Sequence, residues 1–423
     1  MIYLIVISLG IVLLLNFVLL EKDLASPSIL FIGGFFFTAI LAAAFNDVWC
    51  GFYSEYLYLL IVGGSISFLL GCLIVCVFSR KGNAYVKKIE PIILRNDNLL
   101  MLLLIQIVLA CISYIVVRNN TISSDYVMAI GEFYLLNKSG EADIPSYFKV
   151  LQYFNMAGVY ICIYVLMNNK ICGYKDKILL YIPIIVGLMI TLMQGTRNAF
   201  FMFFISAMIM YFILKNIVDS WQPNINILFL KKICLITVIG IGLFQMSYYI
   251  TGRDDINYSF IDLLSSYLGA PIKNLDYFLL ENHSSGKLLG EQTFLQWYKK
   301  LYDITHSSIF ITRDLYEYRW LNNIGLGNVY TIYMPLFNDF GLLGAWGIVG
   351  IIGAFLQIFY YKIRFNMKNN ISIDMYIIIY SYVGFSVFFS FFSNKFFEMT
   401  ISIGFIYLFI ALLIMKKLIF GKW

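Results

Sequence analysis

The stretch Gly325–Gly353, with the sequence GLGNVYTIYMPLFNDFGLLGAWGIVGIIG, joins a polar segment directly to an apolar one. Hydrocarbon would leave polar groups unpaired at this entry to a hydrophobic span, unless protein or a wet cavity takes them up. We therefore expect the polar side chains to pack inward, or to form the wall of a site. They are Asn328, Tyr330, Thr331, Asn338 and Asp339.

Glycine recurs at every third residue in the apolar half of this stretch. Residues spaced by three wind slowly around a helix, because a turn takes about 3.6 residues. Glycine also lets a neighbouring backbone come close, so these positions predict a helix that other helices grip. The residues are Gly341, Gly344, Gly347, Gly350 and Gly353.

The composition of the chain is that of a membrane protein with several spans. Of its 423 residues 61% are hydrophobic and only 13% are charged, and the mean hydropathy is +0.81. A soluble core could not hide so much apolar surface. The formal net charge is +6, but most basic residues lie in short loops, where they report orientation in a membrane and not nucleic-acid binding. We therefore predict an all-α polytopic membrane protein with no nucleic-acid partner.

The sequence gives no indication of a metal site. The seven cysteines are scattered, mostly in or beside apolar runs, and have no paired ligand spacing, so they indicate neither a zinc site nor a disulfide framework. The adjacent pair Asp254 and Asp255 does not by itself indicate a site for a divalent ion. The long outer loop defined below contains no Asp-x-Asp motif. We predict no metal and no cofactor.

Apolar runs of roughly 20 residues, the length that crosses a bilayer as a helix, predict about eleven spans. The first run has no basic leader and no A-x-A cleavage site, so we interpret it as a span and not as a signal peptide. The predicted spans are 2–20, 28–46, 55–78, 98–117, 148–168, 177–195, 198–215, 231–250, 333–361, 374–394 and 397–416.

Positive charge fixes the orientation of these spans. The loop after the third span holds Arg80, Lys81, Lys87, Lys88 and Arg95, and this excess places it in the cytoplasm. Alternation then puts two larger segments outside, at about 118–147 and about 251–332. The chain thus divides into a helical bundle of about eight spans (1–250), a large outer loop (251–332) and about three C-terminal spans (333–423).

The large outer loop is the part of the chain long enough to fold over a substrate. Three of its segments show apolar or aromatic residues at helical spacing with polar residues between them, and we expect short helices lying on the membrane surface. Their aromatic side chains suit either an interfacial belt or stacking on sugar rings. The segments are FIDLLSSYL (260–268), TFLQWYKKLYDI (293–304) and SSIFITRDLYEYRWL (307–321).

Arg197, in QGTRNAF, is the only charge in the apolar expanse from about 178 to 214. A cation at bilayer depth costs about 2.5–3.5 kcal/mol on insertion scales, so it is usually retained for a reason. It either reaches the interface and orients a hairpin, or binds an anion with its planar guanidinium. Arg253, in TGRDD, would lie at the same face, where two arginines could clamp a lipid-linked pyrophosphate. The adjacent Asp254 and Asp255 could instead neutralise it.

Four segments resemble one family of bacterial enzymes. GTRNAF after a span, GRDD at the start of the large loop, SSYLGAPIKNLDYF and above all GNVYTIYMPLFNDFGLLG are similar to the Wzy-type O-antigen polymerases, or oligosaccharide repeat unit polymerases. The resemblance implies an integral inner-membrane glycosyltransferase of GT-C-like architecture, active at the periplasmic face. Such an enzyme transfers a growing glycan from undecaprenyl pyrophosphate onto the next lipid-linked repeat unit. The resemblance thus implies that the site wall, with Asn328, Tyr330, Thr331 and Asn338, contacts the glycan.

The reaction that the resemblance implies needs cations and a base. Cations neutralise the charge that develops on the leaving pyrophosphate, and we assign this role to Arg197 and Arg253, with Arg313 and Arg319 as further candidates in the loop. The acceptor hydroxyl must lose a proton to a carboxylate or imidazole. Asp339 is our first choice, because desolvation at a membrane boundary favours its protonation. His306 is second, because imidazole titrates near neutrality; the other candidates are Asp254, Glu291 and Glu398.

Two other functions fit the same broad plan. A lipid-linked oligosaccharide flippase, which is a transporter, is also polytopic with intramembrane arginines, but such proteins resemble paired bundles with short loops. An O-antigen ligase shares the plan and the periplasmic arginines, and only the NVYT…DFG segment favours the polymerase. Membrane lipid and undecaprenyl-pyrophosphate-linked oligosaccharides are the expected partners. A chain-length regulator and a flippase are expected by family analogy.

Overall fold

The computed structural model describes residues 1–20, 22–79, 89–193, 198–222, 231, 238, 240, 242, 260–281, 286, 288–322, 324–365 and 373–420. Eight helical stretches within these residues are long and apolar enough to cross a membrane, which agrees with a multi-pass membrane protein. They are α1 (Ile2–Leu19), α2 (Pro27–Ala44), α3 to α4 (Glu55–Ser79), α5 (Asn96–Asn120), α7 (Ser146–Ile171), α9 (Asn198–Val218), α14 (Tyr333–Phe365) and α16 (Ile403–Phe420).

Two shorter apolar helices complete the set of described candidates for spans. These are α8 (Ile178–Leu192) and α15 (Ile373–Phe388), which correspond to the predicted spans 177–195 and 374–394. The predicted span 231–250 lies almost wholly outside the described residues. The all-α membrane class is therefore confirmed, while the number of eleven spans and the GT-C-like architecture stay predictions.

The chain forms two compact units whose segments alternate along the sequence. The first unit contains Met1–Tyr85, Tyr258–Ile373 and Val383–Ser402, and the second contains the rest. The first unit therefore joins the N-terminal helices to the large predicted outer loop and to α14. The sequence-based division at residues 250 and 332 follows the expected side of the membrane, and it stays a prediction.

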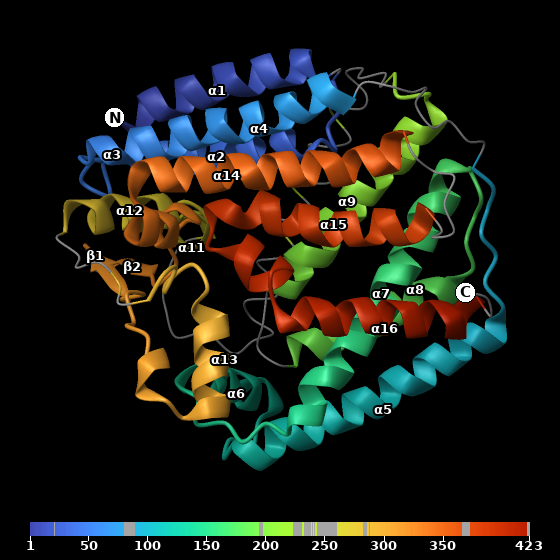
Figure 1. Cartoon of the computed structure of the whole chain (residues 1–423). Helices are drawn as coiled ribbons and strands as arrows, with labels where there is room; N and C mark the ends of the chain where they lie inside the picture. Colours follow the sequence, from blue (N-terminus) through green and yellow to red (C-terminus); the bar gives the residue numbers. More distant parts are fainter. Residues whose placement is uncertain are drawn as a thin grey trace. The chain divides into compact units, whose positions relative to one another are not determined.

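In the first unit, α4 (Gly64–Ser79) and α14 run side by side (Figure 1). A Cβ added at Gly71 would collide with the carbonyl of Gly350, and one at Gly353 with the carbonyl of Phe68. Ser67 Oγ also donates to the carbonyl of Trp346 at 2.7 Å. The predicted close approach is therefore confirmed at Gly350 and Gly353, because only a missing side chain allows these backbones to touch.

Gly341 serves α14 in a different way. Its φ of 67° and ψ of −173° are non-helical and kink α14 after its first two turns. A side chain is strained at such a φ, so the position favours glycine. A Cβ at Gly341 or at Gly347 would meet nothing within 4 Å. The glycine repeat thus combines two packing positions with one backbone kink.

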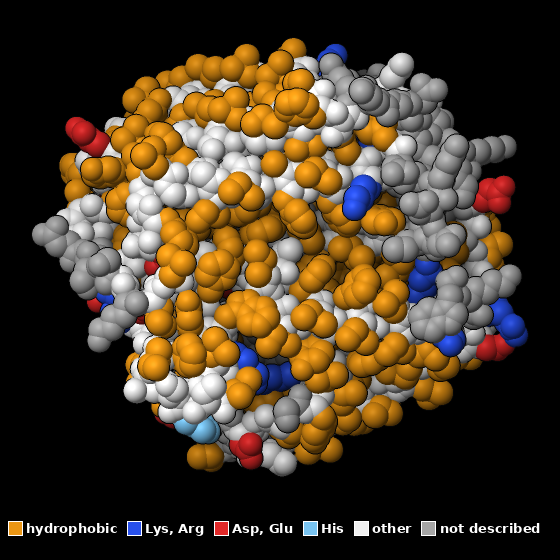
Figure 2. Space-filling model, viewed as in Figure 1, with side chains coloured by type: hydrophobic (Ala, Val, Ile, Leu, Met, Phe, Trp, Pro, Cys, Tyr) orange, Lys and Arg blue, Asp and Glu red, His pale blue; other side chains and the backbone are white. Residues whose placement is uncertain are grey.

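The surface of the helices is strongly apolar. Hydrophobic side chains cover much of the face shown in Figure 2, and charged side chains are sparse on it. The outward side of α1 is an example, with Ile7, Leu14 and Val18 more than half exposed. Such surface suits lipid tails and not water.

The large predicted loop holds α11 (Phe260–Leu268), α12 (Ala270–Leu280), α13 (Leu295–Thr305) and a hairpin of β1 (Arg319–Leu321) and antiparallel β2 (Ile324–Gly327). The helices predicted at 260–268 and 293–304 are confirmed by α11 and α13. The helix predicted at 307–321 is wrong, because this segment forms a 3₁₀ turn (Ser308–Phe310), an extended stretch and β1. Carboxylates accept its backbone N–H groups: Glu291 that of Arg313, and Asp314 that of Tyr316. These bonds replace the i to i−4 bonds of a helix.

A buried ion pair ties α12 to the turn between α2 and α3 within the first unit. Lys273 and Asp276 are both fully buried, with 3.0 Å between Nζ and Oδ2. Asp276 accepts from the backbone N–H groups of Tyr53 and Ser54 at 3.0 and 2.8 Å. Lys273 donates to the carbonyl of Gly51, and its ammonium lies 4.2 Å from the ring centroid of Tyr277. Each charge therefore has several partners, as a buried pair requires.

Polar side chains join three helices of the second unit. Gln106 of α5 donates to Asn155 of α7 at 3.1 Å and to the carbonyl of Pro183 in α8 at 2.9 Å. Asn155 in turn donates to the carbonyl of Gly187 at 3.0 Å. All of this lies within apolar helices, where interhelical hydrogen bonds satisfy groups that lipid cannot.

The smaller predicted outer segment, 118–147, contains α6 (Tyr126–Ser139), and Glu132 of this helix holds the preceding turn. Its carboxylate accepts from the side chain and backbone of Ser123 at 2.7 and 3.1 Å, and from the N–H of Ile122. The Ser123 hydroxyl and these N–H groups lower the pKa of Glu132. A lowered pKa means that the contribution to stability is present above the unfolded pKa and is lost as the pH falls through the folded one.

We therefore expect acid to loosen this turn. Amide exchange at Ile122 and Ser123, corrected for the intrinsic effect of pH, should show full protection at neutral pH. Protection should fall below about pH 4, near the ordinary range of a glutamate. Glu132→Gln should remove the pH dependence, and an unchanged acid response in that variant would contradict the assignment.

Candidate functional site

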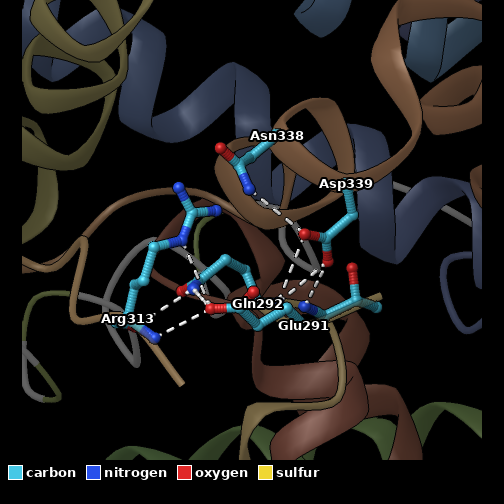
Figure 3. A network of polar contacts seen from close by, with 6 residues as sticks. Glu291, Gln292, Arg313, Asn338 and Asp339 are labelled. Carbon is cyan, nitrogen blue, oxygen red and sulfur yellow. Dashed lines mark hydrogen bonds and ion pairs between the residues drawn. The ribbon is translucent and has the colours of Figure 1, made fainter. Parts of the chain in front are cut away.

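The site begins at Asp339, which lies two residues before the kink in α14. Its carboxylate accepts the backbone N–H groups of Gln292 at 3.0 Å and Thr293 at 2.7 Å, and the side-chain amide of Asn338 at 3.2 Å (Figure 3). Charge-assisted bonds of this kind are stronger than neutral ones. Asp339 thus fastens the loop at 291–293 to the first turns of α14.

Glu291 continues the network on the other side of the loop. Its side chain is only 2% exposed and forms an ion pair with Arg313, with 3.4 Å between Oε1 and Nε. The same oxygen accepts the backbone N–H of Arg313 at 2.8 Å, and Gln292 Nε2 donates to the Arg313 carbonyl at 3.1 Å (Figure 3). Two stretches of the loop, at 291–293 and at 313, are therefore held as one piece.

The third side of the network is a break between α15 and α16. Thr293, whose N–H is bound by Asp339, offers its carbonyl to Asn394 Nδ2 at 3.0 Å. The rings of Phe294 and Phe397 are 5.3 Å apart and perpendicular, and Trp297 Nε1 donates to the carbonyl of Ile401 at 2.6 Å. The loop from 291 to 297 therefore joins the start of α14 to the helix break.

The break itself carries an ion pair in otherwise apolar sequence. After α15 come a 3₁₀ turn (Phe389–Phe391) and a π-helix (Phe396–Thr400), and α16 starts at Ile403. Lys395 Nζ lies 2.6 Å from Glu398 Oε2, and their side chains are 17% and 29% exposed. The Ser393 hydroxyl is 3.4 Å from the same carboxylate. Irregular backbone of this kind is tolerated at membrane depth only inside protein or beside a wet cavity.

Tyr316 shows that these segments converge. Burial raises the pKa of its phenol, and the negative charges of Glu398, Asp339 and Asp314 raise it further. The carboxylates come from the helix break, from α14 and from the loop itself. Tyr316 therefore lies within electrostatic reach of all three parts of the network.

A second group of polar contacts surrounds Arg319. Its guanidinium binds both oxygens of Glu281 at 2.6 Å and donates through Nε to the Tyr330 hydroxyl at 2.8 Å. Tyr330 donates to the carbonyl of Glu317 at 3.0 Å, and burial raises the pKa of its phenol while Arg319 opposes the rise. Thr331 is buried, and its hydroxyl accepts the N–H of Tyr333 at 3.2 Å. These side chains hold the hairpin and the start of α14.

The structure brings some of the predicted site residues together. Asp339, Asn338 and Arg313 share one network with Glu291. Arg319 and Thr331 make no described contact with that network, while the ring of Tyr330 lies 6.0 Å from that of Tyr316. The half-buried Asn328 has no site partner among the described contacts. Glu398, one of the further candidates, joins the network through Asn394: its N–H donates to the Asn394 carbonyl at 3.0 Å, and the Asn394 side chain donates to the Thr293 carbonyl.

Three further predicted residues are not part of the described network. His306 caps α13 with a φ of 50° and is exposed. Since α13 begins two residues after Thr293 and rises 1.5 Å per residue, His306 lies about 15 Å from the loop that Asp339 binds. The structure thus separates the two predicted catalytic residues. Arg197 and Arg253 lie outside the described residues, so their role stays a prediction.

Sequence reasoning missed Lys395 and Asn394. The signal was present in FFSNKFFEM, where Lys395 and Glu398 stand three residues apart inside an apolar region from 373 to 420. From the sequence we place a joint between two spans here and name Glu398 as a candidate base, without its partner Lys395. Burying a charged pair within hydrophobic sequence costs free energy, so such a pair indicates a functional site.

Removal of the Asp339 carboxylate should release the loop. In Asp339→Ala the N–H groups of Gln292 and Thr293 lose their acceptor, and each unpaired buried donor costs about 1–3 kcal/mol. We expect faster amide exchange at 292–294 and faster proteolysis between 286 and 300. Asn338→Ala, which removes only one donor at 3.2 Å, is the matched control. Equal protection of the loop in Asp339→Ala and the wild type would contradict the assignment.

No protein-family model, curated protein or solved structure matches the chain.

Proposed function

We propose that this chain is a polytopic membrane glycosyltransferase, specifically an O-antigen polymerase that acts at the periplasmic face of a bacterial inner membrane. The observation that carries the proposal is the polar network in the first unit. It joins Asp339, from the segment that resembles the polymerases, to the outer loop and to a charged break between two apolar helices. A structural membrane scaffold has no use for such a cluster at the ends of membrane-length helices.

The proposed reaction joins two lipid-linked glycans. A hydroxyl of one repeat unit attacks the anomeric carbon of the growing chain, and undecaprenyl pyrophosphate leaves. Pyrophosphate is a good leaving group, so stabilisation of its charge and positioning of the acceptor carry most of the catalysis. The aromatic and amide side chains near the network suit a glycan, whose hydroxyl groups both donate and accept.

The charges of the described network favour the acceptor side of this reaction. Among the described residues, Glu291, Asp339 and Glu398 stand against Arg313 and Lys395, and both cations are in ion pairs. Arg319 is likewise bound by Glu281. These arginines are therefore better suited to hold the loop than to receive a pyrophosphate. We keep the pyrophosphate role for Arg197 and Arg253.

The test is the surface glycan ladder of a strain that lacks this gene. If the chain is the polymerase, the deletion strain should display lipid A core with a single repeat unit, and wild-type complementation should restore the ladder. Loss of every unit, with lipid-linked repeats retained inside, would support a flippase instead. Full-length polymer that accumulates on the lipid carrier would support a ligase.

The same strain tests the assigned cations. Arg197→Ala and Arg253→Ala, at membrane levels equal to the wild type, should abolish the ladder, while Arg95→Ala should leave it unchanged. Arg95 is the matched control, because it forms an exposed pair with Asp97. A normal ladder from both arginine variants would overturn the pyrophosphate assignment even if polymerisation itself were confirmed.

A further inference from the structure

We propose that Glu398, on the break between α15 and α16, is the general base that accepts the proton of the attacking glycan hydroxyl, and that the ion pair with Lys395 orients its carboxylate. The inference rests on the proposed function and assigns its catalytic carboxylate. Asp339, selected from the sequence for this role, becomes a positioning residue that holds the loop beside the break.

Accessibility separates the three carboxylates of the network. Glu291 is 2% exposed and bound by Arg313, and both oxygens of Asp339 accept N–H groups of the loop or of Asn338. The Glu398 side chain is 29% exposed. Its Oε2 has Lys395 at 2.6 Å, while the described contact of Oε1 is the Ser393 hydroxyl at 3.5 Å. Glu398 thus has both an open side and an oxygen that is only weakly engaged.

Two buried oxygens near the start of the π-helix that carries Glu398 need a hydrogen-bond partner. Thr293 Oγ1 and Asn394 Oδ1 are buried and have no hydrogen-bond partner among the described residues. A buried acceptor without a donor costs about 1–3 kcal/mol, so a hydroxyl or a water is expected to satisfy it. Asn394 is oriented by its donation to the Thr293 carbonyl, so its oxygen is identified by that bond. A glycan hydroxyl bound to Asn394 would lie near Glu398, whose backbone N–H donates to the Asn394 carbonyl at 3.0 Å.

The irregular backbone at Phe389–Thr400 gives a second reason to place substrate here. Broken helices in membrane proteins place polar groups and free backbone ends at the binding site. Here the Ser386 and Thr400 hydroxyls meet across the break at 3.1 Å, and the N–H of Ile332 is bound by the Ser390 carbonyl at 2.8 Å. The break is therefore held in place by the segment that leads into α14 and by its own side chains, as a preorganised site requires.

The proposed step balances without a cofactor. The acceptor oxygen forms a bond to the anomeric carbon as the bond from that carbon to the pyrophosphate oxygen breaks, and the electron pair leaves with the pyrophosphate. The hydroxyl proton passes to the Glu398 carboxylate. The titratable groups that face this carboxylate in the described residues are Lys395 on its own element, Tyr316 on the loop and, beyond Tyr316, Asp339 on α14.

The experiment uses membranes from the deletion strain, supplemented with the full-length protein and with purified lipid-linked repeat unit. We expect Glu398→Gln to lower kcat by about 100-fold or more with KM changed little, as general bases contribute 10²–10⁴-fold. Glu398→Asp should keep part of the activity. Glu132→Gln, which changes a hydrogen-bonded carboxylate elsewhere in the chain, is the control with wild-type kinetics.

Lys395→Gln tests the orientation of the base without changing the carboxylate itself. The variant loses the ammonium that holds Glu398 Oε2 at 2.6 Å, so kcat should fall while KM changes little, and Lys395→Arg, which keeps the ion pair, should recover most of the loss. Wild-type kcat in Lys395→Gln would overturn the assignment, and this variant tests it even where Glu398→Gln does not reach the membrane. Wild-type kcat in a well-expressed Glu398→Gln would overturn it directly. No polymerisation by the wild-type protein would instead overturn the proposed function.

Discussion

Asp276→Asn should leave little folded protein in the membrane. The substitution removes the charge that balances Lys273, and both side chains are fully buried. Breaking a buried ion pair by removal of one partner costs about 3–5 kcal/mol, because the remaining charge stays in a medium that cannot solvate it. That loss is a large part of the total stability of most domains. The N–H groups of Tyr53 and Ser54 would also lose the carboxylate that accepts them.

The measurement is the amount and melting temperature of protein extracted from membranes in mild detergent. Arg95→Gln is the matched control, since it breaks an ion pair of similar length whose side chains are 79% and 77% exposed. Such surface pairs contribute about 0–1 kcal/mol. Lys273→Met combined with Asp276→Leu should recover part of the loss, because no uncompensated charge remains. A melting temperature of Asp276→Asn equal to that of Arg95→Gln would contradict this account.

Gly353→Leu should separate α4 from α14. The new side chain would run into the backbone carbonyl of Phe68, and backbone cannot move aside as a flexible side chain can. Overpacking costs about 1–3 kcal/mol where side chains yield, and more where a helix must shift. Gly347→Leu is the control on the same helix, because a Cβ there meets nothing within 4 Å.

A cysteine crosslink reports the separation directly. Ser67 and Trp346 are joined by a hydrogen bond between the two helices, so cysteines at these positions should crosslink in the wild type and in Gly347→Leu. They should crosslink poorly in Gly353→Leu. Equal crosslinking and equal melting temperatures in the two leucine variants would show that the helices adapt to the added side chain.

The helices could be predicted from the sequence because their signal is local. A run of about 20 apolar residues decides on a spanning helix before any tertiary contact forms. The segment at 307–321 shows where a local pattern fails. Its residue spacing predicts a helix, but a distant carboxylate accepts a backbone N–H group that a helix would use. Glu291, 22 residues away, binds the N–H of Arg313, and no local pattern reveals that bond.

The candidate site could be located from the sequence better than its roles could be assigned. Polar residues at the entry to a hydrophobic span indicated Asp339, and the structure places it in a network. Its role depends on Gln292 and Thr293, about 46 residues earlier in the chain. Because their N–H groups occupy its carboxylate, Asp339 holds the loop in place and is not the base that we propose. His306 was selected by residue type alone. The buried pair of Lys273 and Asp276 was missed, because an i, i+3 pair in a short helix usually lies on the surface.

The pairing of α4 with α14 has a consequence for the synthesis and membrane insertion of the protein. Cys72 donates to the carbonyl of Gly353, 281 residues later in the chain, so α4 leaves the ribosome long before its partner exists. At 5–20 residues per second the wait is roughly 15–60 s. During this time the face of α4 around Gly71, which later packs on Gly350, lacks that partner in the translocon or the bilayer. We expect insertion chaperones to cover this face, and the first unit to close only after synthesis of α14.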